Sequence, residues 1–175
     1  MKKLPLHPAI VVAPVGVAFL IGVVGGVFKV PFFPDLFLFC LPASVGVAVL
    51  QSIFLYQLWA LVQGSDLRAK KPTPGKAIGF WFIPFFGLYW TFILWRNLAL
   101  HLNHLTTRNK VPVELVVVGC ALFIAGLFSI LNPSTPTAQL INAVLNALGF
   151  GGMVIFLITN FYFYGAAREI CEVTK

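Results

Sequence analysis

Two histidines at helical spacing are the first residues in this sequence that could do chemistry. His101 and His104 lie three residues apart, so a helix would place both imidazoles on one face, where they could bind a metal ion. No Asp, Glu or Cys stands near them to complete a ligand set, and Arg108 falls on the same face. We therefore expect a solvated or headgroup-facing helix surface and no metal.

No other pattern points to catalysis or to a cofactor. The chain has five acidic residues and lacks a nucleophile elbow, a phosphate-binding loop, a zinc-protease motif and a pair of carboxylates. The cysteines, Cys40, Cys120 and Cys171, are widely spaced and form no C-x-x-C motif. We expect a protein that is not an enzyme and has no catalytic residues and no cofactor.

Four amide side chains stand within otherwise apolar segments. They are Gln51, Asn142, Asn146 and Asn160. They could line a path for a substrate or ion, as in a small oligomeric transporter or channel. More often such amides join neighbouring helices by hydrogen bonds worth about 0.6 kcal/mol each. No acidic or basic residue accompanies them within a span, which disfavours a proton-coupled pump.

The composition indicates that lipid surrounds most of the chain. Of 175 residues, 59% are hydrophobic and 10% are charged, whereas a soluble domain carries roughly 25% charged residues. The net charge of +7 does not indicate a nucleic-acid partner, because the basic residues lie between apolar runs, where they mark the cytoplasmic side and meet anionic lipid headgroups. We expect an all-α, multi-pass membrane protein.

Four apolar runs are long enough to cross the membrane as helices. They cover about 8–28, 36–62, 111–131 and 138–165. The 21 residues of the first run would reach about 31 Å, and the hydrocarbon layer is about 30 Å thick. Small residues recur at steps of four in two of the runs, which is typical of close helix packing. These stripes are Pro14, Ala18, Gly22 and Gly26, and Ala143, Ala147 and Gly151.

The stretch at 73–108 decides the architecture. Thr73 and Pro74 are typical of a helix start, as N-cap and first helical residue. The uncharged part at 79–95 would reach only about 25 Å as a helix, and Pro84 interrupts it. We predict a short helix, a break at Pro84 and a longer helix, together forming an interfacial or re-entrant element beside four transmembrane helices. The alternative is five transmembrane helices.

The basic residues favour an element that enters and leaves on one side. Without a crossing, eleven of the twelve Lys and Arg residues share one side and only Lys29 lies on the other; with a crossing they split six and six. The positive-inside rule favours the first arrangement, with both termini cytoplasmic. All eight Trp and Tyr residues would then lie at the inner interface, although aromatic belts usually form at both. Glu114 is expected to pair with Arg108 or Lys110.

The same stretch resembles a signature of small multi-pass bacterial membrane proteins that form a domain of unknown function. The resemblance covers about residues 54–104. It rests on Tyr56, Trp59 and Gln63, then on Thr73-Pro74-Gly75-Lys76-Ala77, Gly79-Phe80, Phe82-Ile83-Pro84-Phe85-Phe86 and Leu88-Tyr89-Trp90. In the family pattern asparagine follows the two phenylalanines, and here Gly87 does. The resemblance implies a protein of the bacterial plasma (inner) membrane but no activity.

Three functions fit these observations. The first is a non-enzymatic module that assembles with itself or another membrane protein, with a cytoplasmic-side working surface made by Thr73, Pro74, Gly75, Lys76, Pro84, Phe85, Phe86, Gly87, Tyr89 and Trp90. The second is the transporter or channel. The third is sensing or handling of anionic lipid, for which Lys70, Lys71, Lys76, Arg96 and Arg108 would supply charge.

The topology can be tested by the accessibility of single cysteines. A membrane-impermeant thiol reagent should label cysteines placed within 64–78 and within 100–110 from the same side, because the element between them turns back. Labelling of the two groups from opposite sides would mean five spans.

Overall fold

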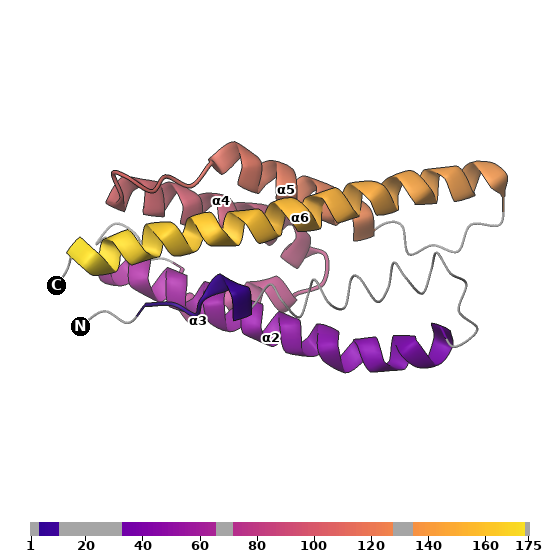
Figure 1. The fold of residues 1–175 in the computed structure, drawn as a ribbon, viewed down its shortest axis with the longest axis horizontal. Helices are drawn as coiled ribbons and strands as arrows, with labels where there is room; N and C mark the ends of the chain where they lie inside the picture. Colours follow the sequence, from indigo (N-terminus) through magenta and orange to yellow (C-terminus); the bar gives the residue numbers. More distant parts are fainter. Residues whose placement is uncertain (1–3, 11–32, 66–71, 128–134, 174–175) are drawn as a thin grey trace.

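The computed structural model describes residues 4–10, 33–65, 72–127 and 135–173 (Figure 1). Its elements are α2 (Phe33–Ser65), α3 (Pro74–Gly79), the 3-10 turn η1 (Phe80–Phe82), α4 (Phe86–Leu105), α5 (Val113–Leu127) and α6 (Pro136–Val173). These ranges contain helices and no strand, so the expectation of an all-α protein is confirmed.

The predicted spans correspond only in part to helices that can be described. The run at 36–62 lies within α2 and the run at 138–165 lies within α6. The run at 8–28 is outside the described residues from residue 11 on, and the run at 111–131 is outside them from residue 128 on. Within the described ranges, α6 is the one helix both long and apolar enough to cross a membrane, and the apolar part of α5, Val113–Gly126, is shorter.

Three helices run in the same direction, and α5 runs against them. Figure 1 shows α2, α4 and α6 all pointing toward the end of the bundle where the chain termini lie. At this end the backbone N–H of Leu6 donates to Oε1 of Gln57 on α2, at 2.7 Å, and the ring of His7 contacts Tyr164 of α6 edge to face, at 4.9 Å between centroids. We call this end of the bundle the terminal end.

The centre of the core is α4. Its residues Leu94, Trp95, Leu98, Ala99 and Leu102 are all buried, and their spacing of three and four places them on one face. This face meets core residues of the other helices, among them Phe54, Leu58 and Trp59 of α2, Val116 and Cys120 of α5, and Phe163 and Ala167 of α6. One face of α4 therefore packs against α2, α5 and α6 along the bundle.

Glycines bring α5 and α6 into contact at backbone distance. A Cβ on Gly126 would lie 2.4 Å from the Cα of Gly149, and a Cβ on Gly152 would lie 2.3 Å from the backbone nitrogen of Phe123. The small-residue stripe expected on this helix was Ala143, Ala147 and Gly151. The structure uses Gly149 and Gly152 instead, because these two face α5, whereas a Cβ on Gly151 would meet open space.

A pair of alanine substitutions at adjacent glycines tests this packing. Gly152→Ala should lower the free energy of unfolding in detergent by roughly 1–3 kcal/mol, because its methyl group would collide with the α5 backbone. Gly151→Ala is the control and should be neutral or stabilising by up to about 1 kcal/mol, because alanine is the better helix former. Equal effects of the two substitutions would contradict the packing described.

Candidate functional site

The chain breaks between α3 and α4 because of a proline and the residue before it. Steric contact with the ring of Pro84 forces the preceding residue out of the helical region, and Ile83 has φ −79° and ψ 118°. Phe85 follows with φ 59° and ψ −48°, and the N–H of Phe86 donates to the carbonyl of Pro84 at 2.6 Å. This is a γ-turn with a positive φ, a rare and strained conformation for phenylalanine.

Gly87 allows the new helix to start directly beneath the turn. Its N–H donates to the carbonyl oxygen of Ile83 at 2.7 Å, and a Cβ at this position would lie 2.3 Å from the carbonyl oxygen of Trp81. Asparagine, the residue of the resembled pattern, could not fit here without a shift of the backbone. In this chain position 87 therefore shapes the turn and offers no polar side chain.

The break forms the tip of a hairpin whose two ends lie at the terminal end of the bundle (Figure 1). The entry is fixed at the carbonyl oxygen of Pro72, which accepts hydrogen bonds from Nε1 of Trp59 at 2.7 Å and Nε2 of Gln63 at 2.5 Å. The exit lies beside it, because the rings of Trp59 and His101 are 6.1 Å apart. The break itself packs near Phe123, ten residues into α5 and so about 15 Å from the start of that helix.

Three aromatic rings hold the two arms of the hairpin together. Phe80 meets Phe86 and Trp90 edge to face, with centroids 5.7 and 5.1 Å apart, and Phe86 stacks on Trp90 at 5.8 Å. The indole Nε1 of Trp90 donates to the carbonyl of Ala77, at 2.7 Å, which ties α4 to α3. We call these three rings the aromatic clamp.

The structure divides the signature residues into two groups. Thr73 and Pro74 start α3 as N-cap and first residue, although the Thr73 hydroxyl makes no capping hydrogen bond, and Pro84, Phe86, Gly87 and Trp90 build the turn and the clamp. Gly75 and Lys76 are exposed on α3. A second group points outward around the break, and we call it the tip. Its members, with their exposed fractions, are Phe82 (66%), Ile83 (46%), Phe85 (88%) and Tyr89 (63%).

The four amides do not form one cluster. Gln51 of α2 and Asn160 of α6 are buried and meet, with Nε2 of Gln51 donating to Oδ1 of Asn160 at 3.3 Å. Asn142 and Asn146 lie 18 and 14 residues before Asn160 on α6, which places them about 27 and 21 Å away along the helix axis. The inner pair joins two helices, as such amides often do.

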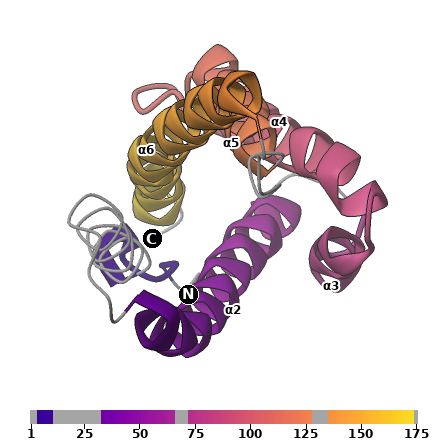
Figure 2. The ribbon, with the colours of Figure 1, turned by 90° about the vertical axis from the view of Figure 1, so that its right-hand side faces the viewer.

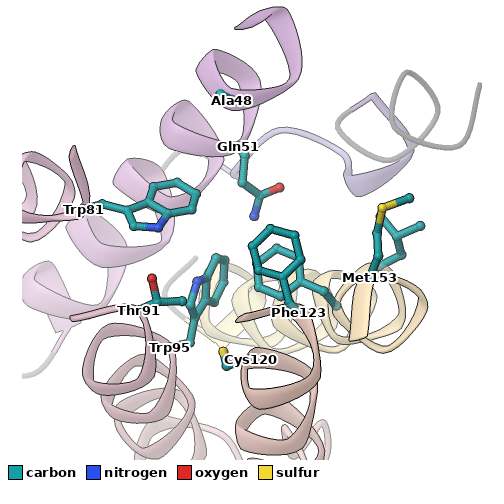
Figure 3. Close-up of a pocket in the computed structure, with 10 residues that line it drawn as sticks. Ala48, Gln51, Trp81, Thr91, Trp95, Cys120, Phe123 and Met153 are labelled. Carbon is teal, nitrogen blue, oxygen red and sulfur yellow. The ribbon is translucent and has the colours of Figure 1, made fainter. Parts of the chain in front are cut away.

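A cavity of about 230 Å³ lies at the level of this pair, between the helices and the hairpin (Figure 3). Every element from α2 onward except α3 contributes to its wall. The lining residues are Ala48, Gln51, Trp81, Thr91, Trp95, Cys120, Phe123, Met153, Phe156 and Leu157. Figure 3 shows the amide of Gln51 directed into the space bounded by Trp81, Trp95 and Phe123. The cavity is apolar, with few polar groups.

The two histidines do not share a site. The ring of His101 meets Trp59 edge to face, and His104 is exposed. In the part of the chain that the structure describes, no three His, Cys, Asp or Glu residues come together in a way that could hold a metal ion.

The residue that the sequence analysis missed is Glu169 of α6. Its carboxylate accepts hydrogen bonds from the backbone N–H groups of Thr107, Arg108 and Asn109, at 2.8, 3.0 and 2.7 Å. The Thr107 hydroxyl and the Asn109 amide donate to it as well, at 3.1 and 3.0 Å. The backbone hydrogen bonds from Arg108 and Thr107 lower the pKa of Glu169 from 4.5 to about 2.

The turn that Glu169 holds is stabilised further from within. The side-chain amide of Asn103 pairs with the backbone of Val111, donating at 2.7 Å and accepting at 2.6 Å. Nζ of Lys110 donates to the carbonyls of Asn103 and Thr106 at the end of α4, where a cation also favours the helix dipole. The carboxylate in contact with this turn is thus Glu169 of α6. Among the described residues, the expected ion pair of Glu114 with Arg108 or Lys110 does not form; Lys110 binds backbone carbonyls instead.

Comparison with models of protein families, with curated proteins and with solved structures finds no match for this chain.

Glu169 makes the stability of the fold depend on pH. Its folded-state pKa lies below its ordinary value, so its contribution is complete above about pH 4.5 and is lost as the pH falls toward 2. The midpoint of thermal unfolding in detergent should fall over this range in the native protein, and the fall should be smaller in Glu169→Gln.

The control is Glu172→Gln. Glu172 pairs with Arg168 one turn away, in an exposed ion pair of 2.8 Å, and such pairs contribute little to stability. This variant should keep the acid transition of the native protein. If the unfolding midpoints of Glu169→Gln and Glu172→Gln change equally between pH 5 and pH 2, the hydrogen bonds from Glu169 to the α4–α5 turn do not contribute to stability.

Proposed function

We propose that this chain is a multi-pass membrane protein that serves as a non-enzymatic assembly module. Its four spans are the runs at 8–28, 36–62, 111–131 and 138–165, and the hairpin at 73–108 is re-entrant, entering the bilayer from the cytoplasmic face and returning to it. Through the tip of the hairpin the protein contacts a second copy or another membrane protein. The expected location is the inner membrane of a bacterium, with both termini in the cytoplasm.

Several observations support the membrane arrangement. The helix α6 has 38 residues, about 57 Å, and is apolar enough to cross the bilayer. Large apolar side chains cover its outward face, among them Leu140, Ile141, Val144 and Ile158; lipid is the solvent that such a surface fits. The terminal end carries Arg108, Lys110 and Arg168, in keeping with a cytoplasmic position.

The tip carries the argument for assembly. Phe85 has a backbone conformation that costs about 1–3 kcal/mol, and 88% of its side chain is nevertheless exposed, so no contact within the described chain offsets this strain. Strain at an exposed aromatic residue is typical of a functional surface. Phe82, Ile83 and Tyr89 extend the same apolar surface, and the aromatic clamp fixes its shape before any partner arrives.

A groove beside the tip enlarges this surface. It lies between α2 and the hairpin, has a volume of about 650 Å³ and is almost wholly apolar. Its walls come from Val45, Ala48, Val49, Ser52, Ile53, Tyr56 and Gln57 of α2, together with Ile78 and Phe82 of the hairpin. A helix of a partner protein could place its small residues in this groove and contact the tip with its larger ones.

A second function, the handling of anionic lipid, is favoured by one further surface feature. An open hollow of about 390 Å³ at the terminal end is lined by Arg108, Asn109 and Lys110 above Ile158, Phe161, Tyr162 and Gly165. Basic side chains beside an apolar surface suit a lipid, whose phosphate headgroup would meet the charges and whose acyl chain would meet the apolar side chains. Part of this charge is already used, because Lys110 binds the end of α4 and Glu169 lies beside Arg108.

Substitution of Phe85 tests the assembly function. Phe85→Gly removes the ring and the strain together, so the free energy of unfolding should stay equal or rise by about 1 kcal/mol. The fraction of assembled protein after chemical crosslinking in native membranes should fall severalfold, because the most exposed residue of the tip is lost. Phe85→Asn should give the same loss of assembly, since asparagine tolerates a positive φ but is polar.

The matched control is Phe161→Ala, which removes an exposed aromatic ring from α6 far along the chain from the tip. It should leave crosslinking unchanged. Native protein that crosslinks only as lone monomers, or a Phe85→Gly variant that assembles as the native protein does, would overturn the proposed role of the tip.

A further inference from the structure

We propose that the central cavity binds a small, mostly apolar molecule of about the size of a substituted ring, which carries one carbonyl-type oxygen as a hydrogen-bond acceptor. This site is separate from the tip of the hairpin, because the tip residues point outward and none of them lines the cavity. The proposal therefore does not depend on the assembly function.

The size and the wall of the cavity define the apolar part of the ligand. A buried apolar cavity of about 150 Å³ accepts benzene, and this cavity measures about 230 Å³, which leaves room for a ring with a short substituent. The indoles of Trp81 and Trp95 and the rings of Phe123 and Phe156 provide flat surfaces. Met153 adds a thioether that adapts to the shape of a ligand.

A buried donor in the wall defines the polar part. Nε1 of Trp95 and Nδ2 of Asn160 have no hydrogen-bond partner in the described structure, and both residues are fully buried, with exposed fractions of 0% and 1%. A buried N–H without a partner is unfavourable, and native structures rarely retain one without a reason. Of these two residues, Trp95 lines the cavity, and the partner that its N–H lacks is an acceptor, so a ligand should supply an oxygen and not an N–H.

The two donors belong to the same layer of the core as the cavity. The ring of Trp95 contacts Phe156 at 4.7 Å and Phe163 at 5.2 Å, and Asn160 stands between these two phenylalanines on α6. Asn160 also accepts from Gln51, which lines the cavity. The hydroxyl of the wall is occupied, since Thr91 donates to the carbonyl of Gly87 at 2.7 Å. Among the residues of the wall, Trp95 is thus the one with a fully buried N–H that lacks a partner.

The test compares two probes that differ in the acceptor alone. Acetophenone has a ring and a carbonyl oxygen, and ethylbenzene has a ring of the same size without the oxygen. Full-length protein with ¹⁵N-labelled indoles is titrated with each compound in detergent micelles. Acetophenone should shift the Trp95 indole resonance downfield and saturate it, whereas ethylbenzene should bind roughly five- to tenfold more weakly, the ratio that one net hydrogen bond gives.

The indoles of Trp59 and Trp90 are internal references, because each already donates to a backbone carbonyl and neither lines the cavity. Their resonances should not move beyond the change that solvent partition causes. Trp95→Phe assigns the Trp95 resonance and keeps an aromatic wall without its donor. In this variant acetophenone should lose its advantage over ethylbenzene.

A second pair of variants tests the location. Cys120→Phe places a ring in the cavity, since Cys120 is buried on α5 and lines it, and should weaken acetophenone binding at least tenfold. Ala121→Phe is the control, since Ala121 is exposed on α5 and does not line the cavity. The titration of the native protein decides even if a variant fails to fold. A Trp95 resonance that responds to neither probe, or equally to both, overturns the proposal. If it responds to neither, the acceptor for the Trp95 N–H would be a bound water.

Discussion

The arrangement of the whole bundle depends on a backbone constraint at Pro84. Proline has no N–H to donate and its ring excludes the preceding residue from the helical region, so the helix that begins at Pro74 cannot continue into α4. The chain turns back, and α4 returns to the terminal end in contact with α2, α5 and α6. Seen along the bundle in Figure 2, α3 stands outside the main group of helices, beside α2. A continuous helix would have taken Leu94, Trp95 and Leu98 away from the core that they form.

A reversal of this kind leaves two weak points, and hydrogen bonds and rings strengthen both. At the tip, the aromatic clamp and the hydrogen bond from Trp90 to Ala77 connect the arms. At the other end of α4, Glu169 holds three consecutive N–H groups of the following turn and Lys110 binds the last carbonyls of the helix. The contacts at the tip and those around Glu169 each join α4 to a neighbouring segment, so α4 is fixed at its two ends.

Fixing α4 in this way creates a core with a polar layer that is only partly satisfied. Gln51 and Asn160 satisfy each other in part, and Trp95 faces the same layer with an indole N–H that has no partner. In the surroundings of apolar side chains, such a group is unfavourable unless an acceptor reaches it. The protein therefore has two features with different functions, an outward apolar tip and an inward cavity, and the break between α3 and α4 positions both, since Trp81 of η1 lines the cavity while Phe82 and Phe85 point outward.

The sequence by itself determined those features that local stereochemistry controls. Thr73-Pro74 predicted a helix start and Pro84 predicted the break between two helices; both are present. Only the tertiary structure decided which surfaces meet. Three features could not be predicted: the contact of Gly149 and Gly152 with α5, the packing of one face of α4 against three other helices, and the hydrogen bonds from the α4–α5 turn to Glu169, sixty residues away. The physical reason is that backbone preferences act over a few residues, whereas the rotation of one helix against another depends on the shapes of all the side chains between them.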